Sequence, residues 1–110
     1  MNKTSLLKGH LEMCVLSILK KQKSYGYEIM KELEKYDLKL KGVSSIYPIL
    51  TKLKEQQWVD VSSQITESGK ARIYYTINPQ GEKYLEMIIK DWQELQNNIR
   101  DLLTNNEEGL

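Results

Sequence analysis

The sequence predicts a mainly α-helical, α+β fold with a core of three helices, a two-stranded β-hairpin and a long C-terminal helix. Three observations support this prediction. Apolar residues recur at three- and four-residue spacing in four stretches, which is the periodicity of amphipathic helices. Between the third and fourth stretches the apolar residues alternate instead, as they do in strands. With 110 residues, the chain has the size of one domain with a small core.

The first two helical stretches are expected to form core helices. The first helix is expected from Leu6 to about Lys21, and the second from Tyr25 to about Tyr36 with Ser24 as its N-cap. Residues 37–41 alternate in polarity and could add one short strand. The two apolar stripes consist of Leu7, Leu11, Cys14, Val15 and Ile18, and of Tyr25, Ile29, Met30 and Leu33.

The third stretch, from Gly42 to Trp58, has the pattern of a helix with one apolar and one polar face. Pro48 fits only the first turn, so the helix is expected to begin near Ser44, with Ser44 or Ser45 as N-cap. The buried face is expected to contain Ile46, Ile49, Leu50 and Leu53. The opposite face is expected to contain Ser44, Pro48, Thr51, Lys52 and Glu55, with Ser45 and Tyr47 on its flanks.

Hydroxyl groups and a cation on that polar face suit contacts with the phosphates and base edges of DNA. An ordinary surface helix with a solvated polar face has the same pattern, so the helix alone does not distinguish DNA binding from simple exposure to solvent. The next segment favours DNA. Two β-rich runs, residues 58–65 and 72–78, flank TESGKA, which indicates a hairpin with Gly69 at its bend. Three helices followed by such a hairpin make a winged helix-turn-helix, whose third helix reads DNA.

The final helical stretch is predicted to begin with Asn78 as N-cap and Pro79 at the first helical position. It continues for about 25 residues, further than a three-helix core can cover, so it is expected to pack against a copy of itself. We therefore divide the chain into a winged helix-turn-helix domain (1–78), a dimerisation helix (79–104) and a flexible tail (105–110). The heptad a and d positions are Leu85, Ile88, Trp92, Leu95, Ile99 and Leu102, and Ile89 and Leu103 widen this stripe.

Charge is unevenly distributed along the chain, although the formal net charge is only +1. Residues 1–78 contain 13 Lys and Arg against 8 Asp and Glu, whereas residues 79–110 contain 3 against 7. A basic front half and an acidic back half are typical of a DNA-facing module joined to an association element.

The sequence gives little support for a disulfide, a metal or cofactor site, an enzyme or a membrane protein. The single cysteine, Cys14, cannot form an internal disulfide and is expected to be a packed thiol in a reducing compartment. His10, the only histidine, has no acid or cysteine at ligand spacing, so neither a metal nor a cofactor is expected. The lack of a catalytic set or phosphate-binding loop argues against an enzyme. Without a membrane-spanning apolar run or a signal peptide, we expect a cytoplasmic protein.

The assembled pattern resembles the PadR family of winged-helix transcriptional repressors. The resemblance covers residues 6–103 and rests on four blocks: LLKGHLEMCVLSILK, SYGYEIMKEL, SSIYPILTKLKEQQWV and GKARIYYTINPQGEKYL. It implies a dimer held by the C-terminal helix together with the first helix, operator binding through the third helix and wing, and often release by a small ligand. The residues that match the recognition helix and wing motifs are Ser44, Ser45, Tyr47, Pro48, Lys52, Lys54, Lys70, Arg72 and Tyr75.

Three features depart from the family pattern. The stretch before the paired tyrosines is usually richer in arginine, whereas this chain offers only Lys70 and Arg72. Asn78 stands where a threonine is common, and both residues cap helices. The C-terminal region is short, so a separate effector-binding domain is not expected.

We therefore expect a homodimer that places two third helices in successive major grooves, about 34–36 Å apart, on a pseudo-palindromic operator. Lysines are assigned to phosphates, hydroxyl-bearing residues to bases or backbone, and Arg72 to the minor groove. Since the recognition helix has no arginine, DNA shape is expected to contribute to specificity. A winged helix that contacts only proteins is the alternative. The predicted DNA contacts are Tyr25, Ser44, Ser45, Tyr47, Pro48, Thr51, Lys52, Lys54, Lys70 and Arg72.

The predicted dimer interface includes Trp92 near the two-fold axis. A pair of indoles there could border an apolar cavity for a flat aromatic or hydrophobic effector, and a plain packed tryptophan is the alternative. The predicted interface residues are Leu7, Leu11, Leu85, Ile88, Ile89, Trp92, Leu95, Ile99 and Leu102.

Overall fold

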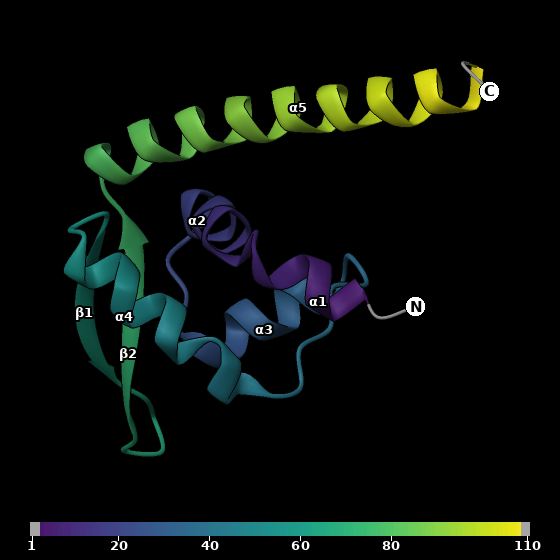
Figure 1. Ribbon diagram of the computed structural model, residues 1–110. Coiled ribbons are helices and arrows are strands. Elements are labelled where there is room, and N and C mark those ends of the chain that lie inside the picture. Colours follow the sequence, from purple (N-terminus) through teal and green to yellow (C-terminus); the bar gives the residue numbers. More distant parts are fainter. Residues whose placement is uncertain (1–2, 109–110) are drawn as a thin grey trace.

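The computed structural model describes residues 3–108, and it confirms a mainly helical winged fold. Helices α2, α3 and α4 pack together, the hairpin lies beside them, and α5 crosses α2 and projects beyond the rest of the molecule (Figure 1). The elements are α1 (Lys3–Lys8), α2 (Leu11–Lys21), α3 (Gly26–Glu34), the 3-10 turn η1 (Val43–Ser45), α4 (Tyr47–Glu55), β1 (Val59–Ile65), β2 (Ala71–Ile77) and α5 (Pro79–Glu108).

The core forms where the apolar faces of α2, α3 and α4 meet. Val15, Leu33 and Leu50, one from each of these helices, are buried, as the helical spacing predicted. Leu85 at the start of α5 and the paired strand ends Val59 and Ile77 close this core. The small core therefore depends on the hairpin base and on the first turns of α5 as well as on the three helices.

The first predicted helix is in fact two helices. Helix α1 ends at Lys8 and α2 begins at Leu11, with Gly9 and His10 as the break. The amide of His10 donates to the carbonyl of Leu7 at 2.8 Å and closes α1. Leu7 and Leu11 both still face the core, so the apolar stripe continues across the break and conceals it in the sequence.

Ser24 is not the N-cap of α3. Its backbone instead pairs with Tyr75 of β2 through hydrogen bonds of 3.1 and 2.9 Å, which adds a one-residue third strand to the hairpin. Tyr25 takes the N-cap position, and its amide donates to Glu28 Oε1 at 3.2 Å. The tyrosine therefore lies outside the core stripe to which the spacing assigned it. The short strand considered for residues 37–41 does not form.

The start of α4 also differs from the expectation. Ser44 and Ser45 lie in η1 and neither caps the helix, which begins at Tyr47 with Ile46 in the N-cap position. Ile46 is fully buried, so packing of its side chain fixes where the chain turns into the helix. Pro48 lies in the first turn of α4, as predicted.

Strands β1 and β2 form the predicted antiparallel hairpin. Val59 pairs with Ile77 at its base and Ile65 with Ala71 near its tip. Gly69 has a φ of 83°, a left-handed conformation that glycine adopts without strain, so it supplies the bend as predicted. Only the base of the hairpin is buried, and its distal half projects into solvent as a wing.

Helix α5 begins as predicted, because Asn78 Oδ1 accepts a hydrogen bond from the amide of Gly81 at 2.9 Å. It extends to Glu108, so the predicted end at residue 104 is too early and residues 105–108 are helical. Residues 109–110 of the expected tail lie outside the described residues. Among the residues described, no helix is both long and apolar enough to cross a membrane.

Candidate nucleic-acid interface

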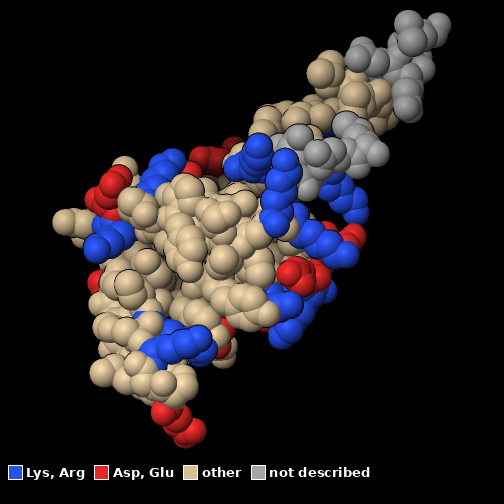
Figure 2. Space-filling model, turned by 90° about the horizontal axis from the view of Figure 1, so that it is seen from below, with Lys and Arg blue, Asp and Glu red and all other residues tan. Residues whose placement is uncertain are grey.

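The exposed face of α4 offers hydroxyl and aromatic groups rather than a dense set of charges. Ser44, Tyr47, Pro48 and Thr51 are exposed around its start, and Lys54 is exposed toward its end. Viewed from below, the side of the molecule on which α4 begins is largely uncharged at its centre, and both basic and acidic side chains lie around its edge (Figure 2). An uncharged centre suits contacts in a DNA groove, and the lysines and arginine at its edge suit contacts with the flanking phosphates.

Tyr47 at the start of α4 is exposed yet held in place. Its side chain is 52% exposed, and its ring lies against the backbone of Gly26 at the start of α3. A Cβ atom at position 26 would approach Tyr47 Cε1 to 3.2 Å, so only glycine leaves the ring this position without displacement. Tyr75 lies near Tyr47, and its pKa is raised by burial and, to a smaller extent, by Tyr47.

A cluster of cations and aromatic rings lies on the outer face of the wing. The guanidinium carbon of Arg72 is 4.5 Å from the ring centroid of Tyr25, and this ring meets Tyr74 edge-on at 5.4 Å. The ammonium of Lys23 lies 5.6 Å from the Tyr74 centroid. We call Lys23, Tyr25, Arg72 and Tyr74 the wing cluster. Arg72 is half-buried, and cation–π attraction and the ring contacts fix the orientation of its guanidinium.

Sequence reasoning selected Tyr25 and Arg72 of this cluster but missed Lys23 and Tyr74. The strand alternation of β2 does place Arg72 and Tyr74 on one face, which was an available signal. The pairing of Ser24 with β2, which brings Lys23 and Tyr25 to that face, has no signature in the sequence.

Lys70 lies at the tip of the wing, as expected. Its side chain is exposed, and its amide donates to Thr66 Oγ1 at 3.2 Å, which fixes the backbone around the bend. The carbonyl of Lys70 accepts from the amide of Thr66 at 2.8 Å. The lysine is therefore presented by an ordered turn.

Lys52 differs from the other predicted contacts, because an acidic side chain already holds it. Its ammonium lies 2.8 Å from Glu12 Oε2 of α2. The hydrogen bond and the charge of Glu12 raise the pKa of Lys52. The structure therefore places this lysine on the flank of α4 that faces α2.

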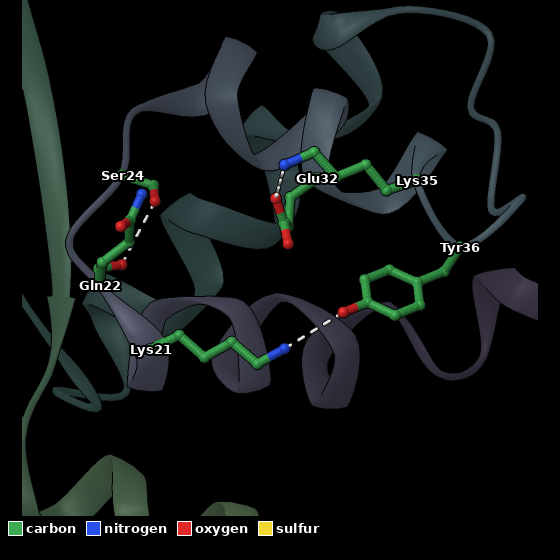
Figure 3. A network of polar contacts seen from close by, with 6 residues as sticks. All are labelled: Lys21, Gln22, Ser24, Glu32, Lys35 and Tyr36. Carbon is green, nitrogen blue, oxygen red and sulfur yellow. Dashed lines mark hydrogen bonds and ion pairs between the residues drawn. The ribbon is translucent and has the colours of Figure 1, made fainter.

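A groove of about 480 Å³ lies between α2 and α3. Figure 3 shows its polar side chains engaged with one another. Lys21 Nζ donates to the hydroxyl of Tyr36 at 3.3 Å, and Lys35 pairs with Glu32 at 3.0 Å. These contacts leave the groove with paired charges, whereas Lys54 on α4 and Lys70 on the wing are exposed and Arg72 is half-buried against Tyr25.

The predicted dimer residues fall into three groups by exposure. Leu7, Leu11 and Leu85 are already buried by the core of their own chain and leave little surface for a partner. Ile88, Ile89 and Trp92 are half-buried, and the distal residues Leu95, Ile99 and Leu102 are exposed.

Trp92 borders a hollow of about 220 Å³ between the start of α2 and α5. The imidazole of His10 meets the indole edge-on, with the ring centroids 6.4 Å apart. Met13, Ile88 and Leu95 contribute apolar walls. The predicted cavity was one bordered by a pair of indoles near the two-fold axis, whereas this hollow lies within one chain and is bordered by one indole and by His10.

Comparison with known proteins agrees with this geometry. Residues 15–87, which run from α2 to the start of α5, match the PadR-like family of transcriptional regulators. The chain belongs to this family. A DNA-binding regulator is therefore the established class, and the family is one of transcriptional regulators rather than enzymes.

Solved structures of other PadR proteins share the fold of this PadR-like regulator. A PadR-like transcriptional regulator from Bacillus cereus is 30% identical, with a TM-score of 0.77 over 90% of this chain and 96% of its own. A PadR family regulator from Eggerthella lenta is 28% identical, with a TM-score of 0.83 over 90% of this chain and 86% of its own. An uncharacterised protein from Lysinibacillus sphaericus is 27% identical over 100% of this chain and 99% of its own.

Proposed function

We propose that this PadR-like regulator is a homodimeric repressor that binds a pseudo-palindromic operator through α4 and the wing. The observation that carries the proposal is the exposed, largely uncharged start of α4 with the wing cluster and Lys70 presented beside it. A winged helix-turn-helix uses these two elements to enter the major groove and to contact the adjacent backbone or minor groove.

The contacts are assigned by chemistry and exposure. Hydroxyl and aromatic groups at the start of α4 face bases or sugar–phosphate backbone, while exposed cations neutralise phosphates. Arg72, oriented by Tyr25, lies along the minor groove. The proposed groove contacts are Ser44, Ser45, Tyr47, Pro48 and Thr51, and the proposed phosphate contacts are Lys54 and Lys70. Lys52 is no longer assigned as a free phosphate ligand, because Glu12 holds it.

The dimer forms through α5, in this proposal. Leu95, Ile99 and Leu102 share one face of a helical segment that extends beyond the core, and an exposed apolar stripe of this kind is buried when two helices associate. A two-fold pair then spaces the two α4 helices to match one turn of DNA, about 34–36 Å. Residues 1–78 supply DNA binding, and the helix that begins at residue 79 supplies association.

A small aromatic effector is proposed for the hollow at Trp92. The edge-on contact with His10 and the surrounding aliphatic side chains make a surface on which a flat apolar molecule could stack. Trp58 stacks on the ring of Tyr84, so a Trp58→Phe variant keeps a ring in that place and leaves Trp92 as the single tryptophan. Quenching of its fluorescence by planar hydrophobic compounds is the expected result, and unchanged emission across such compounds would indicate a packed tryptophan only.

Selection of bound duplexes from a random DNA pool tests the function as a whole. The expected result is a two-fold symmetric consensus with half-sites one helical turn apart, since two α4 helices would read it. Enrichment of single half-sites would contradict the dimer, and no enrichment over competitor DNA would contradict operator binding.

A further inference from the structure

Glu12 of α2 is contacted by side chains from two other helices. Its Oε2 lies 2.8 Å from the ammonium of Lys52 on α4, and its Oε1 accepts from the hydroxyl of Tyr84 on α5 at 3.4 Å. These partners are 40 and 72 residues away along the chain. One carboxylate therefore ties the recognition helix to both α2 and the long C-terminal helix.

An aromatic stack holds the Tyr84 side chain, and therefore its hydroxyl, in place. The Tyr84 ring stacks on Trp58 with a centroid distance of 3.6 Å and an interplanar angle of 12°. Trp58 lies in the short link between α4 and β1, immediately before β1, so the stack fixes the hydroxyl relative to both elements. The pKa of Tyr84 is raised by burial and then by the charge of Glu12, so the hydroxyl stays a donor to the carboxylate at neutral pH.

The Lys52 side of the link reaches the proposed DNA surface. Lys52 is 53% exposed and lies next to exposed Thr51 and one turn after exposed Pro48, both proposed groove contacts. Glu12 is only 25% exposed, so the carboxylate lies beneath the ammonium. The Glu12 carboxylate already offsets the charge of this ammonium and would repel a DNA phosphate that approached α4, so the two anions compete for Lys52.

We propose that Glu12 is a positioning residue that holds Lys52 against α2 and thereby limits the affinity of the recognition helix for DNA. The proposal rests on the proposed function, in which α4 lies against DNA. The raised pKa of Lys52 agrees with this interaction, because the ion pair with Glu12 favours the charged ammonium. Releasing Lys52 adds one phosphate contact, which steepens the salt dependence of binding by about one unit in the log–log slope.

The test compares wild type with Glu12→Gln on a duplex from the selected pool, titrated at several salt concentrations. Glutamine keeps the shape of the side chain and an oxygen for the Tyr84 hydroxyl. We expect binding about three- to tenfold tighter near 0.1 M salt, with a slope steeper by about one. In a Lys52→Met background the same Glu12 change should leave the slope unaltered. Glu55→Gln on the last turn of α4 is the matched control, since its effect on affinity should be the same with or without Lys52.

A second measurement needs no DNA and separates the two proposals. In Glu12→Gln, acylation of Lys52 by an activated ester, followed by mass spectrometry, should be about twofold faster or more because the pKa of the freed amine falls. Lys54, on the same helix, serves as the internal reference. Failure of wild type to bind any duplex would reject the proposed function alone. Unchanged Lys52 reactivity, or weaker DNA binding by Glu12→Gln, would overturn the role of Glu12.

Discussion

At the scale of single residues, two of the proposed DNA contacts are held in position by neighbouring groups. Tyr47 rests on the backbone of Gly26, and Arg72 rests on the ring of Tyr25. Each contact removes conformations that the side chain would otherwise lose on binding, so affinity rises without any added charge. The residues behind the contacts therefore matter for binding although they need not touch DNA.

Gly26→Ala tests the contact between the Tyr47 ring and the backbone of Gly26. The new Cβ would lie 3.2 Å from the Tyr47 ring and push it outward, while alanine at the start of α3 favours the helix. We expect little loss of thermal stability and DNA binding weaker by about 1 kcal/mol, roughly fivefold. A double-mutant cycle with Tyr47→Ala is the control, because the alanine at 26 should have almost no further effect once the ring is absent. Additive losses would argue that Gly26 acts elsewhere.

Arg72→Ala tests the wing cluster. We expect weaker binding by about 1–3 kcal/mol and a salt slope shallower by about one, since one cation leaves the DNA surface. Lys90→Ala, which removes an exposed cation from α5, is the matched control and should have little effect. Tyr25→Leu should reproduce part of the affinity loss with no change in slope. Equal losses for Arg72 and Lys90 would show a general charge effect.

At the scale of elements, contacts at the junction of α4, the hairpin and α5 determine the position of α5 relative to the base of the wing. Asn78 caps α5 through Oδ1 and also donates from Nδ2 to the carbonyl of Gln57 at 2.8 Å. Gly81 lies against the backbone of Trp58, where a Cβ would overlap the carbonyl oxygen and come within 2.8 Å of Ile77 Cγ1. The two residues fix α5 against the wing base.

Substitutions at this junction should destabilise the whole fold. Asn78→Ala removes the cap and leaves the Gln57 carbonyl without its donor, so we expect a loss of about 1–2 kcal/mol in the free energy of unfolding. Gly81→Ala should lower the free energy of unfolding by about 3 kcal/mol, because the Trp58 backbone that the new Cβ would meet cannot move easily. Urea denaturation measures both. Gly9→Ala, where the structure has nothing within 4 Å of a new Cβ, is the control and should be nearly neutral.

At the scale of the whole molecule, the chain is elongated because α5 leaves the core. The principal extents are 64 × 31 × 20 Å, and the distal half of α5 accounts for the long dimension (Figure 1). That half carries an apolar stripe that the chain itself does not cover. Burial of this stripe against a second copy would supply the driving force for association.

Leu95→Glu with Ile99→Glu tests the dimer. These side chains are 50% and 47% exposed, so the changes should leave the fold intact but place two charges in the proposed interface. We expect a monomer in sedimentation and a loss of cooperative binding to full palindromes. Met87→Glu is the matched control, because Met87 is 53% exposed on a different face of α5 and should leave the dimer unchanged. A dimer that survives the double change would exclude this stripe as the interface.

Local patterns predicted most of the helices and the hairpin. They failed where a continuous apolar stripe concealed the break at Gly9 and His10, and where a contact from far along the chain intervened. Val15, Leu33 and Leu50 follow helical spacing and are buried as that spacing requires. Ser24 has the chemistry of an N-cap, but pairing with Tyr75 uses it as a strand residue. Lys52 has the chemistry of a phosphate ligand, but Glu12, 40 residues away, already holds it.

The sequence by itself determined the order of elements, the apolar faces, the cap at Asn78 and the bend at Gly69, because periodicity and backbone conformation act over a few residues. Only the tertiary structure decided which polar groups meet: Tyr47 on Gly26, Arg72 on Tyr25, and Lys52 and Tyr84 on Glu12. The physical reason is that such contacts depend on how separate helices and strands pack in space, and spacing along the chain carries no record of that.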